Sequence, residues 1–190
     1  MAKPKIFESG RDMMLSLGVI VIMMIGGVAF TGLCSFNPGT PENGPVPQVD
    51  AHSFLTMEAA SAGFAVREPA LPQGWITNSA RRAAVGPATA AVVGVITDQE
   101  GYLQLYQTGA DVAATVRDID ADFREHARSV DVSGRKVDIY ASPNHEADVR
   151  DLWVTDLGDA RIVVTGAATD EEFSQLLAAT IAAKPVRSGA

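Results

Sequence analysis

An uncharged, apolar run near the N-terminus constrains this chain more than any other feature. It extends from Met13 to Leu33, and no charged residue occurs between Asp12 and Glu42. A helix needs about 20 apolar residues to cross a hydrocarbon core of roughly 30 Å. The run therefore predicts a transmembrane helix over residues 13–34, in a single-pass membrane protein.

The basic residues predict how this helix is oriented. Lys3, Lys5 and Arg11 precede it, and the next basic residue is Arg67. The excess of positive charge on the cytoplasmic side of membrane proteins places the N-terminus in the cytoplasm. We therefore expect a cytoplasmic tail at residues 1–12 and a location in the plasma membrane, with all that follows the helix extracytoplasmic.

Small residues in the apolar run suggest a contact with another helix. Gly26, Gly27 and Thr31 leave a surface that a second membrane helix can approach closely. These three residues are our candidates for membrane-helix packing. The run has no ionisable side chain, which argues against a proton or ion path through it.

A linker follows at residues 35–50. The stretch from Asn37 to Pro47 contains four prolines and two glycines, a composition that excludes a helix or a central strand. The single cysteine, Cys34, excludes an intramolecular disulfide. Its place after the apolar run leaves lipidation as an alternative to an uncleaved anchor.

Charge argues against nucleic acid as a partner. The first twelve residues carry three basic and two acidic side chains. The remaining 12 basic and 21 acidic residues have a formal charge of −9. A polyanion would be repelled on average by this surface.

Residues 51–185 have the pattern of one extracytoplasmic domain, with a short tail at 186–190. Helices are predicted from Ser53 to Gly63, from Asp111 to Ala127, and after a capping box at Thr169–Glu172. The first helix places Phe54, Met57 and Ser61 on one side, and the second has one apolar stripe of Val112, Val116, Ile119 and Phe123. Strand-like runs lie between them, and the turn Ser133-Gly134 predicts a hairpin between two of these runs. They cover residues 75–85, 90–97, 102–107, 130–132, 137–140, 152–155 and 161–165, with a possible short strand at 64–66. Hairpin-length connections indicate an α+β domain, whose mainly antiparallel sheet of five to six strands is covered by amphipathic helices.

Several short segments, in order, resemble one family. They are Arg11–Met13 with the apolar run, Leu71–Trp75, Gly94–Thr97, Tyr102–Gln107 and Val163–Gly166. The chain resembles an actinobacterial family of single-pass membrane proteins, domain of unknown function family 4245. The resemblance implies one N-terminal span and one extracytoplasmic domain, and it supplies no catalytic residues. By analogy, small proteins of this layout serve as accessory subunits of actinobacterial respiratory and cell-envelope complexes.

The sequence contains no recognisable catalytic set, cofactor motif or metal-binding motif. The densest polar cluster is Asn144-His145-Glu146 with Asp148 and Asp151, which we interpret as a solvated loop. Leu71, Pro72 and Trp75 form either part of the core or an exposed docking loop.

Two functions remain open. The first is a non-catalytic accessory or scaffold subunit of a larger integral membrane protein complex, bound through both the transmembrane helix and the external domain. The alternative is a membrane-anchored, extracytoplasmic ligand- or lipid-binding module. A filled core would favour the first function, and a large apolar pocket would favour the second.

Overall fold

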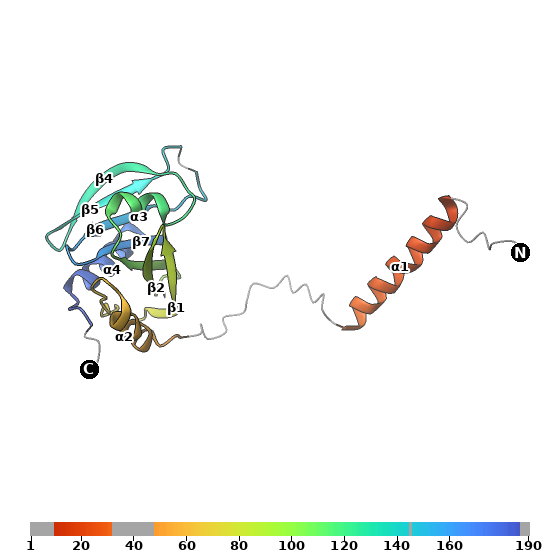
Figure 1. Ribbon diagram of the computed structural model, residues 1–190, viewed down its shortest axis with the longest axis horizontal. Coiled ribbons are helices and arrows are strands. Elements are labelled where there is room, and N and C mark those ends of the chain that lie inside the picture. The colour runs from red at the N-terminus through yellow and green to blue at the C-terminus, as the bar shows by residue number, and fades with distance from the viewer. Residues whose placement is uncertain (1–9, 32–47, 145, 187–190) are drawn as a thin grey trace, which may run out of the picture. The chain divides into compact units, whose positions relative to one another are not determined.

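The computed structural model describes residues 10–31, 48–144 and 146–186. The chain divides into two compact units, residues 1–44 and 45–190, which are considered separately. The described part of the first unit is helix α1 (Gly10–Thr31) (Figure 1). The second unit contains every strand and the other three helices that the described residues form.

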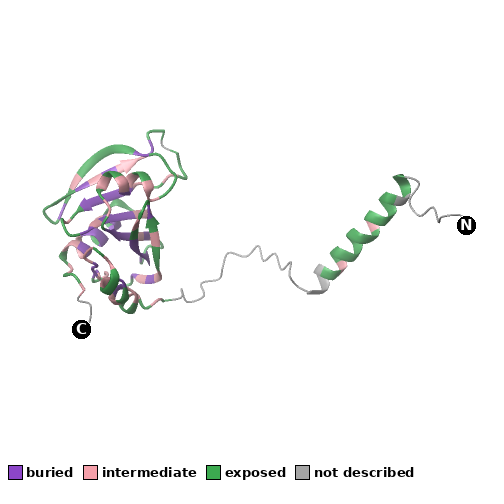
Figure 2. Ribbon diagram, viewed as in Figure 1, coloured by how far each residue is buried: buried purple, intermediate pink, exposed green. Residues whose placement is uncertain are grey.

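Helix α1 covers most of the segment for which we predicted a membrane span. Among the described residues, however, no helix has the combination of length and apolar character that a membrane crossing requires. The predicted span over 13–34 is therefore not found there, and its last three residues lie outside the described part of the chain. Figure 2 shows most of the described residues of α1 as exposed, and Gly18 and Gly26 are intermediate.

The second unit is built on one antiparallel sheet of seven strands. Their order across the sheet is β1-β2-β3-β7-β6-β5-β4. Two meanders, β1–β3 and β4–β7, thus meet where β3 pairs with β7. The strands are β1 (Ile76–Val85), β2 (Ala88–Ile96), β3 (Tyr102–Thr108), β4 (Glu125–Val132), β5 (Arg135–Ala141), β6 (Leu152–Asp156) and β7 (Arg161–Ala167).

The sheet separates two hydrophobic cores. The larger core joins the sheet to α2 (Ala51–Ser61) and α4 (Asp170–Ala182), and it contains Leu55, Leu105 and Leu177. The smaller core lies on the opposite face under α3 (Val112–Asp118), where Val112 and Val116 pack against Val163 and its neighbours. The α+β class with a mainly antiparallel sheet and covering helices is confirmed.

The sheet has seven strands where we predicted five to six, and the predicted run at 130–132 marked only the last three residues of β4. Most of β4 is exposed, and it lies at one edge of the sheet, paired only with β5 among the described strands. Its sequence, Glu-His-Ala-Arg-Ser-Val-Asp-Val, includes a bulge between His126 and Arg128. Such an edge strand needs no continuous apolar face, so hydrophobic alternation does not reveal all of it.

The predicted helix from Asp111 to Ala127 is also corrected. Asp111 does cap α3 through a hydrogen bond from the Ala114 N–H, at 2.7 Å. The helix ends at Asp118, however, and strand β4 begins at Glu125. Phe123, expected on the buried stripe, is instead 69% exposed.

The other two predicted helices are present, but α2 buries a different face from the predicted one. Helix α2 starts after Asp50, which accepts a hydrogen bond from the Ser53 N–H, and it buries Leu55 and Glu58 while Met57 is 60% exposed. Helix α4 has the predicted capping box, in which Thr169 and Glu172 satisfy each other's backbone amides. The predicted strand at 64–66 is not formed.

Candidate functional site

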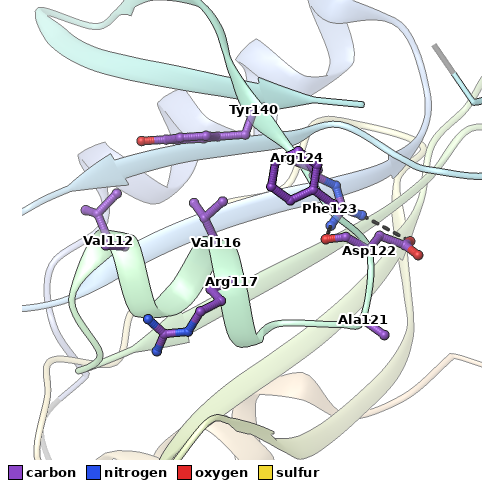
Figure 3. A pocket seen from close by; sticks show the side chains of 9 residues that line it. Val112, Val116, Arg117, Ala121, Asp122, Phe123, Arg124 and Tyr140 are labelled. Atoms are coloured by element: carbon purple, nitrogen blue, oxygen red, sulfur yellow. Dashed lines mark hydrogen bonds and ion pairs between the residues drawn. The ribbon is translucent and has the colours of Figure 1, made fainter. Parts of the chain in front are cut away.

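The candidate site is a groove between α3 and strand β5, on the sheet face that bears the smaller core. Its volume is about 600 Å³, and most of its lining is apolar. In Figure 3, Val112 and Val116 point from α3 toward the ring of Tyr140 on β5. The lining is completed by Ala113, Arg117, Ala121, Asp122, Phe123 and Arg124.

The segment between α3 and β4, residues 119–124, forms one wall of this groove because Arg124 organises it. The Arg124 side chain is almost wholly buried. Its Nη1 and Nη2 donate to the two carboxylate oxygens of Asp120 at 2.7 and 2.9 Å, and its Nε donates to the Arg150 carbonyl at 2.7 Å. Burial raises the pKa of Asp120, but hydrogen bonds from Arg124 and from the Asp122 N–H outweigh it and hold the pKa below its usual value.

A second, more polar depression of about 310 Å³ shares Asp122 and Arg124 with the groove. It includes Tyr102, Gln104 and Tyr106 from strand β3. The Tyr106 hydroxyl donates to Gln104 Oε1 at 2.7 Å, and Gln104 Nε2 donates to the Tyr102 hydroxyl at 3.0 Å. These side chains are hydrogen-bonded to one another and form the polar floor of the depression.

His126, Ser129 and Asp138 lie together on β4 and β5 but lack the geometry of a catalytic triad. The Ser129 hydroxyl donates to Asp138 at 2.5 Å, and the same His126 nitrogen, Nε2, lies 3.1 Å from both. In a triad the serine would instead donate to one imidazole nitrogen while the carboxylate held the other. Lys136 also pairs with Asp138 at 2.8 Å, which makes this a surface ion-pair cluster.

Comparison with known families shows where the chain belongs. The family described as "Protein of unknown function (DUF4245)" matches residues 5–180. The chain belongs to this family. No curated protein and no solved structure matches it.

The structure places the predicted docking residues of this DUF4245 chain mainly in the core. Trp75 is 8% exposed, belongs to the larger core, and donates from Nε1 to Asp98 Oδ1 at 3.1 Å. Leu71 packs against the same core, and Pro72 is half-buried. Trp75 is therefore a core residue, whereas Leu71 and Pro72 are only partly buried.

The other predicted sites lie on α1 or partly outside the described residues. Gly26 and Gly27 lie on α1, where an added Cβ would meet no atom within 4 Å, and the Thr31 side chain lies outside the described residues. His145 also lies outside them. Across the described segments, no group of three or more His, Cys, Asp or Glu side chains is placed to hold a metal ion.

The sequence pattern marked the groove residues but assigned them to the core. Val112, Val116 and Phe123 are spaced as one helical stripe, and only the first two lie on a helix. The signal that could have separated them is the run of aspartates at 118, 120 and 122. Aspartate competes for backbone hydrogen bonds and disfavours the helix interior.

Proposed function

We propose that this protein is a non-catalytic accessory or scaffold subunit, held in a larger membrane complex by its N-terminal helix and its external domain. The observation that carries this proposal is the apolar surface of α1. Its large apolar side chains between Met13 and Ile25 are 45–75% exposed, and from Val19 to Ile25 they occupy successive positions. Successive positions point to all sides of a helix, and a helix that is apolar all round requires a covering of lipid or protein.

The charge pattern supports a membrane as part of that covering. The uncharged run continues past α1 to Glu42, and the three basic residues before it favour a cytoplasmic N-terminus. On this proposal, residues 13–34 form a single-pass anchor in the plasma membrane and residues 51–185 lie outside. A respiratory or cell-envelope complex of an actinobacterium is the setting that the family resemblance suggests.

The domain supports binding more than catalysis. Both of its cores are filled by packed side chains. The charged clusters described above are satisfied internally, with Arg124 held by Asp120 and Asp138 held by Lys136 and Ser129. A catalytic group must instead be available to a substrate.

Copurification tests the proposal. The full chain, extracted from native membranes in mild detergent, is expected to recover a stoichiometric membrane partner. Gly27→Leu should weaken recovery, since a larger side chain keeps a second helix from approaching closely. Gly18→Leu is the matched control, because nine residues or two and a half turns place it on the opposite side of α1.

Removing residues 48–190 should also weaken recovery, because two linked contacts bind more tightly than either one alone. The accessory function is wrong if the wild-type chain recovers no membrane partner. It is also wrong if both Gly27→Leu and the domain deletion leave recovery at the wild-type level.

The groove favours a second candidate, a ligand- or lipid-binding module. Its volume and apolar lining fall within the range of small-molecule sites. Titration of the full chain with palmitate distinguishes the two functions. Saturable binding that Val116→Asp abolishes would favour the module, provided that the variant keeps the wild-type melting temperature.

A further inference from the structure

We propose that the groove between α3 and β5 is the docking surface of the external domain, and that its occupant is a partner-protein segment with apolar side chains flanked by lysine or arginine. This inference rests on the proposed accessory function, for which it names the surface and the chemistry of the partner. Its evidence comes from one exposed aromatic side chain and the charges around it.

Phe123 supplies the apolar anchor. It is 69% exposed at the rim of the groove, although the domain has cores on both faces of its sheet that could have received it. Val112, Val116 and Tyr140 extend the apolar surface from Phe123 into the groove (Figure 3). Exposed apolar patches lined by aromatic residues are typical of protein-binding surfaces, and aromatic residues carry much of the binding energy there.

The charge around this anchor is negative. Residues 111–125 contain five acidic residues and two arginines, a formal charge of −3. Both arginines are already paired, Arg117 with Asp118 at 2.7 Å and Arg124 with Asp120 at 2.7 Å.

The negative charge beside Phe123 is left over from these pairs. Asp122 shares the Arg124 guanidinium with Asp120, in a longer ion pair of 3.5 Å, and is 45% exposed. Glu125 is exposed and has no ion pair among the described residues. A bound segment would therefore meet a net negative charge next to the apolar anchor, from Glu125 and from two carboxylates, Asp120 and Asp122, that share one guanidinium.

This combination selects one kind of occupant. A second copy of this chain would bring the same acidic rim against this one, and an anionic lipid headgroup would also be repelled. A segment that places apolar side chains in the groove and cations at its rim has complementary chemistry. Amphipathic segments that bind in apolar grooves do so through regularly spaced apolar anchors.

Site-specific photo-cross-linking tests the occupant. Replacing Phe123 with the aromatic photo-cross-linker p-benzoylphenylalanine, in the full chain in native membranes, is expected to yield an adduct with another polypeptide. Peptide mapping should place the cross-link in a segment that contains apolar residues and at least two lysines or arginines. The matched control position is Met57, which is 60% exposed on α2 at the opposite face of the sheet, and it should not form this adduct.

Two variants separate the apolar and the electrostatic contributions. For these variants the cross-linker is placed at Ala121 instead of position 123. Phe123→Ser should then reduce recovery of the cross-linked partner by about tenfold or more. The double variant Asp122→Asn and Glu125→Gln should reduce recovery about threefold or more at low salt and change it little at 0.5 M salt. Gln175→Leu, an exposed substitution on α4, should have no effect.

Each other outcome would overturn this inference. A lipid adduct, an adduct with a second copy, an acidic mapped segment or equal yields from positions 123 and 57 would each contradict it. If the wild-type chain recovers a membrane partner and Phe123→Ser recovers it equally well, only this inference is wrong. If the wild-type chain recovers none, the accessory function itself is wrong.

Discussion

Buried polar residues hold the irregular segment around Arg67, between α2 and β1, against the sheet. Gln107 on β3 is fully buried, and its side-chain amide pairs with the backbone of Arg67 as a neighbouring strand would. The Arg67 N–H donates to Gln107 Oε1, and Gln107 Nε2 donates to the Arg67 carbonyl, both at 2.7 Å. The Arg67 guanidinium in turn donates to both carboxylate oxygens of Asp159 at 2.8 and 2.9 Å.

Replacing Gln107 with leucine should therefore destabilise the domain strongly. Gln107→Leu leaves two buried backbone groups without partners, and each loss is worth about 1–3 kcal/mol. We expect the free energy of unfolding to fall by about 2–4 kcal/mol in urea denaturation. Gln175→Leu, the same substitution on an exposed surface, should change it by about 0.5 kcal/mol or less.

The pair of Arg67 and Asp159 predicts a dependence of stability on pH. Hydrogen bonds from Arg67 lower the pKa of Asp159 from its ordinary value of 3.8. A carboxyl whose pKa is lower in the folded state stabilises that state above its unfolded pKa. This contribution is lost as the pH falls through the folded pKa.

Asp159→Asn should thus destabilise the protein at pH 7, by about 1–2 kcal/mol since Asp159 is half exposed. The difference in melting temperature between wild type and variant should shrink as the pH falls below about 4. Asp148→Asn, at an exposed position, serves as the control. If the difference in melting temperature between wild type and Asp159→Asn stays constant from pH 7 to pH 2.5, it does not arise from the ionised pair of Arg67 and Asp159.

At the scale of elements, the connection between α3 and β4 decides the shape of the groove. Arg124 is the residue that holds this connection, because it binds Asp120, the Asp122 carbonyl and the Arg150 carbonyl at once. The polypeptide therefore leaves α3 at Asp118 and crosses to the edge strand β4. Phe123 is left at the rim as a consequence.

We expect Arg124→Leu to loosen this connection while leaving the sheet intact. Hydrogen exchange of the amides in residues 119–124 should become about tenfold faster or more, because the five hydrogen bonds that the guanidinium donates are removed. Amides of β2 and β3 should keep their wild-type rates. Arg117→Leu, which removes an exposed pair with Asp118, should leave residues 119–124 unchanged.

At the scale of the whole molecule, the second unit has what an independent domain needs. Its sheet carries a filled core on each face, and its helices cover both. The lone Cys34 lies outside it. A domain of this size buries enough apolar surface to fold without a disulfide or a metal ion.

Residues 45–190 alone should accordingly unfold in one cooperative transition. The melting temperature should match that of the domain in the full chain within about 3 °C, and EDTA should not change it. Circular dichroism measures both. A non-cooperative transition, or one that EDTA shifts by more than this margin, would contradict an autonomous and metal-free domain.

Local patterns in the sequence were enough to predict much of this fold. The capping box at Thr169 predicted the start of α4, and the Ser133-Gly134 pair predicted the hairpin between β4 and β5. Both signals act within a few residues, since they concern backbone amides or positive φ angles at adjacent positions. The α+β class followed from these elements in order.

Contacts between distant residues decided the rest. The end of α3 depends on Arg124 binding Arg150, 26 residues away, and the burial of Trp75 depends on packing across the sheet. The exposure of Phe123 follows from the contact between Arg124 and the Arg150 carbonyl. A helical stripe in the sequence specifies which side chains could share a face, but only tertiary packing determines which of them are covered. The sequence thus determined the apolar helix and the order of the elements, while the tertiary structure alone created the groove.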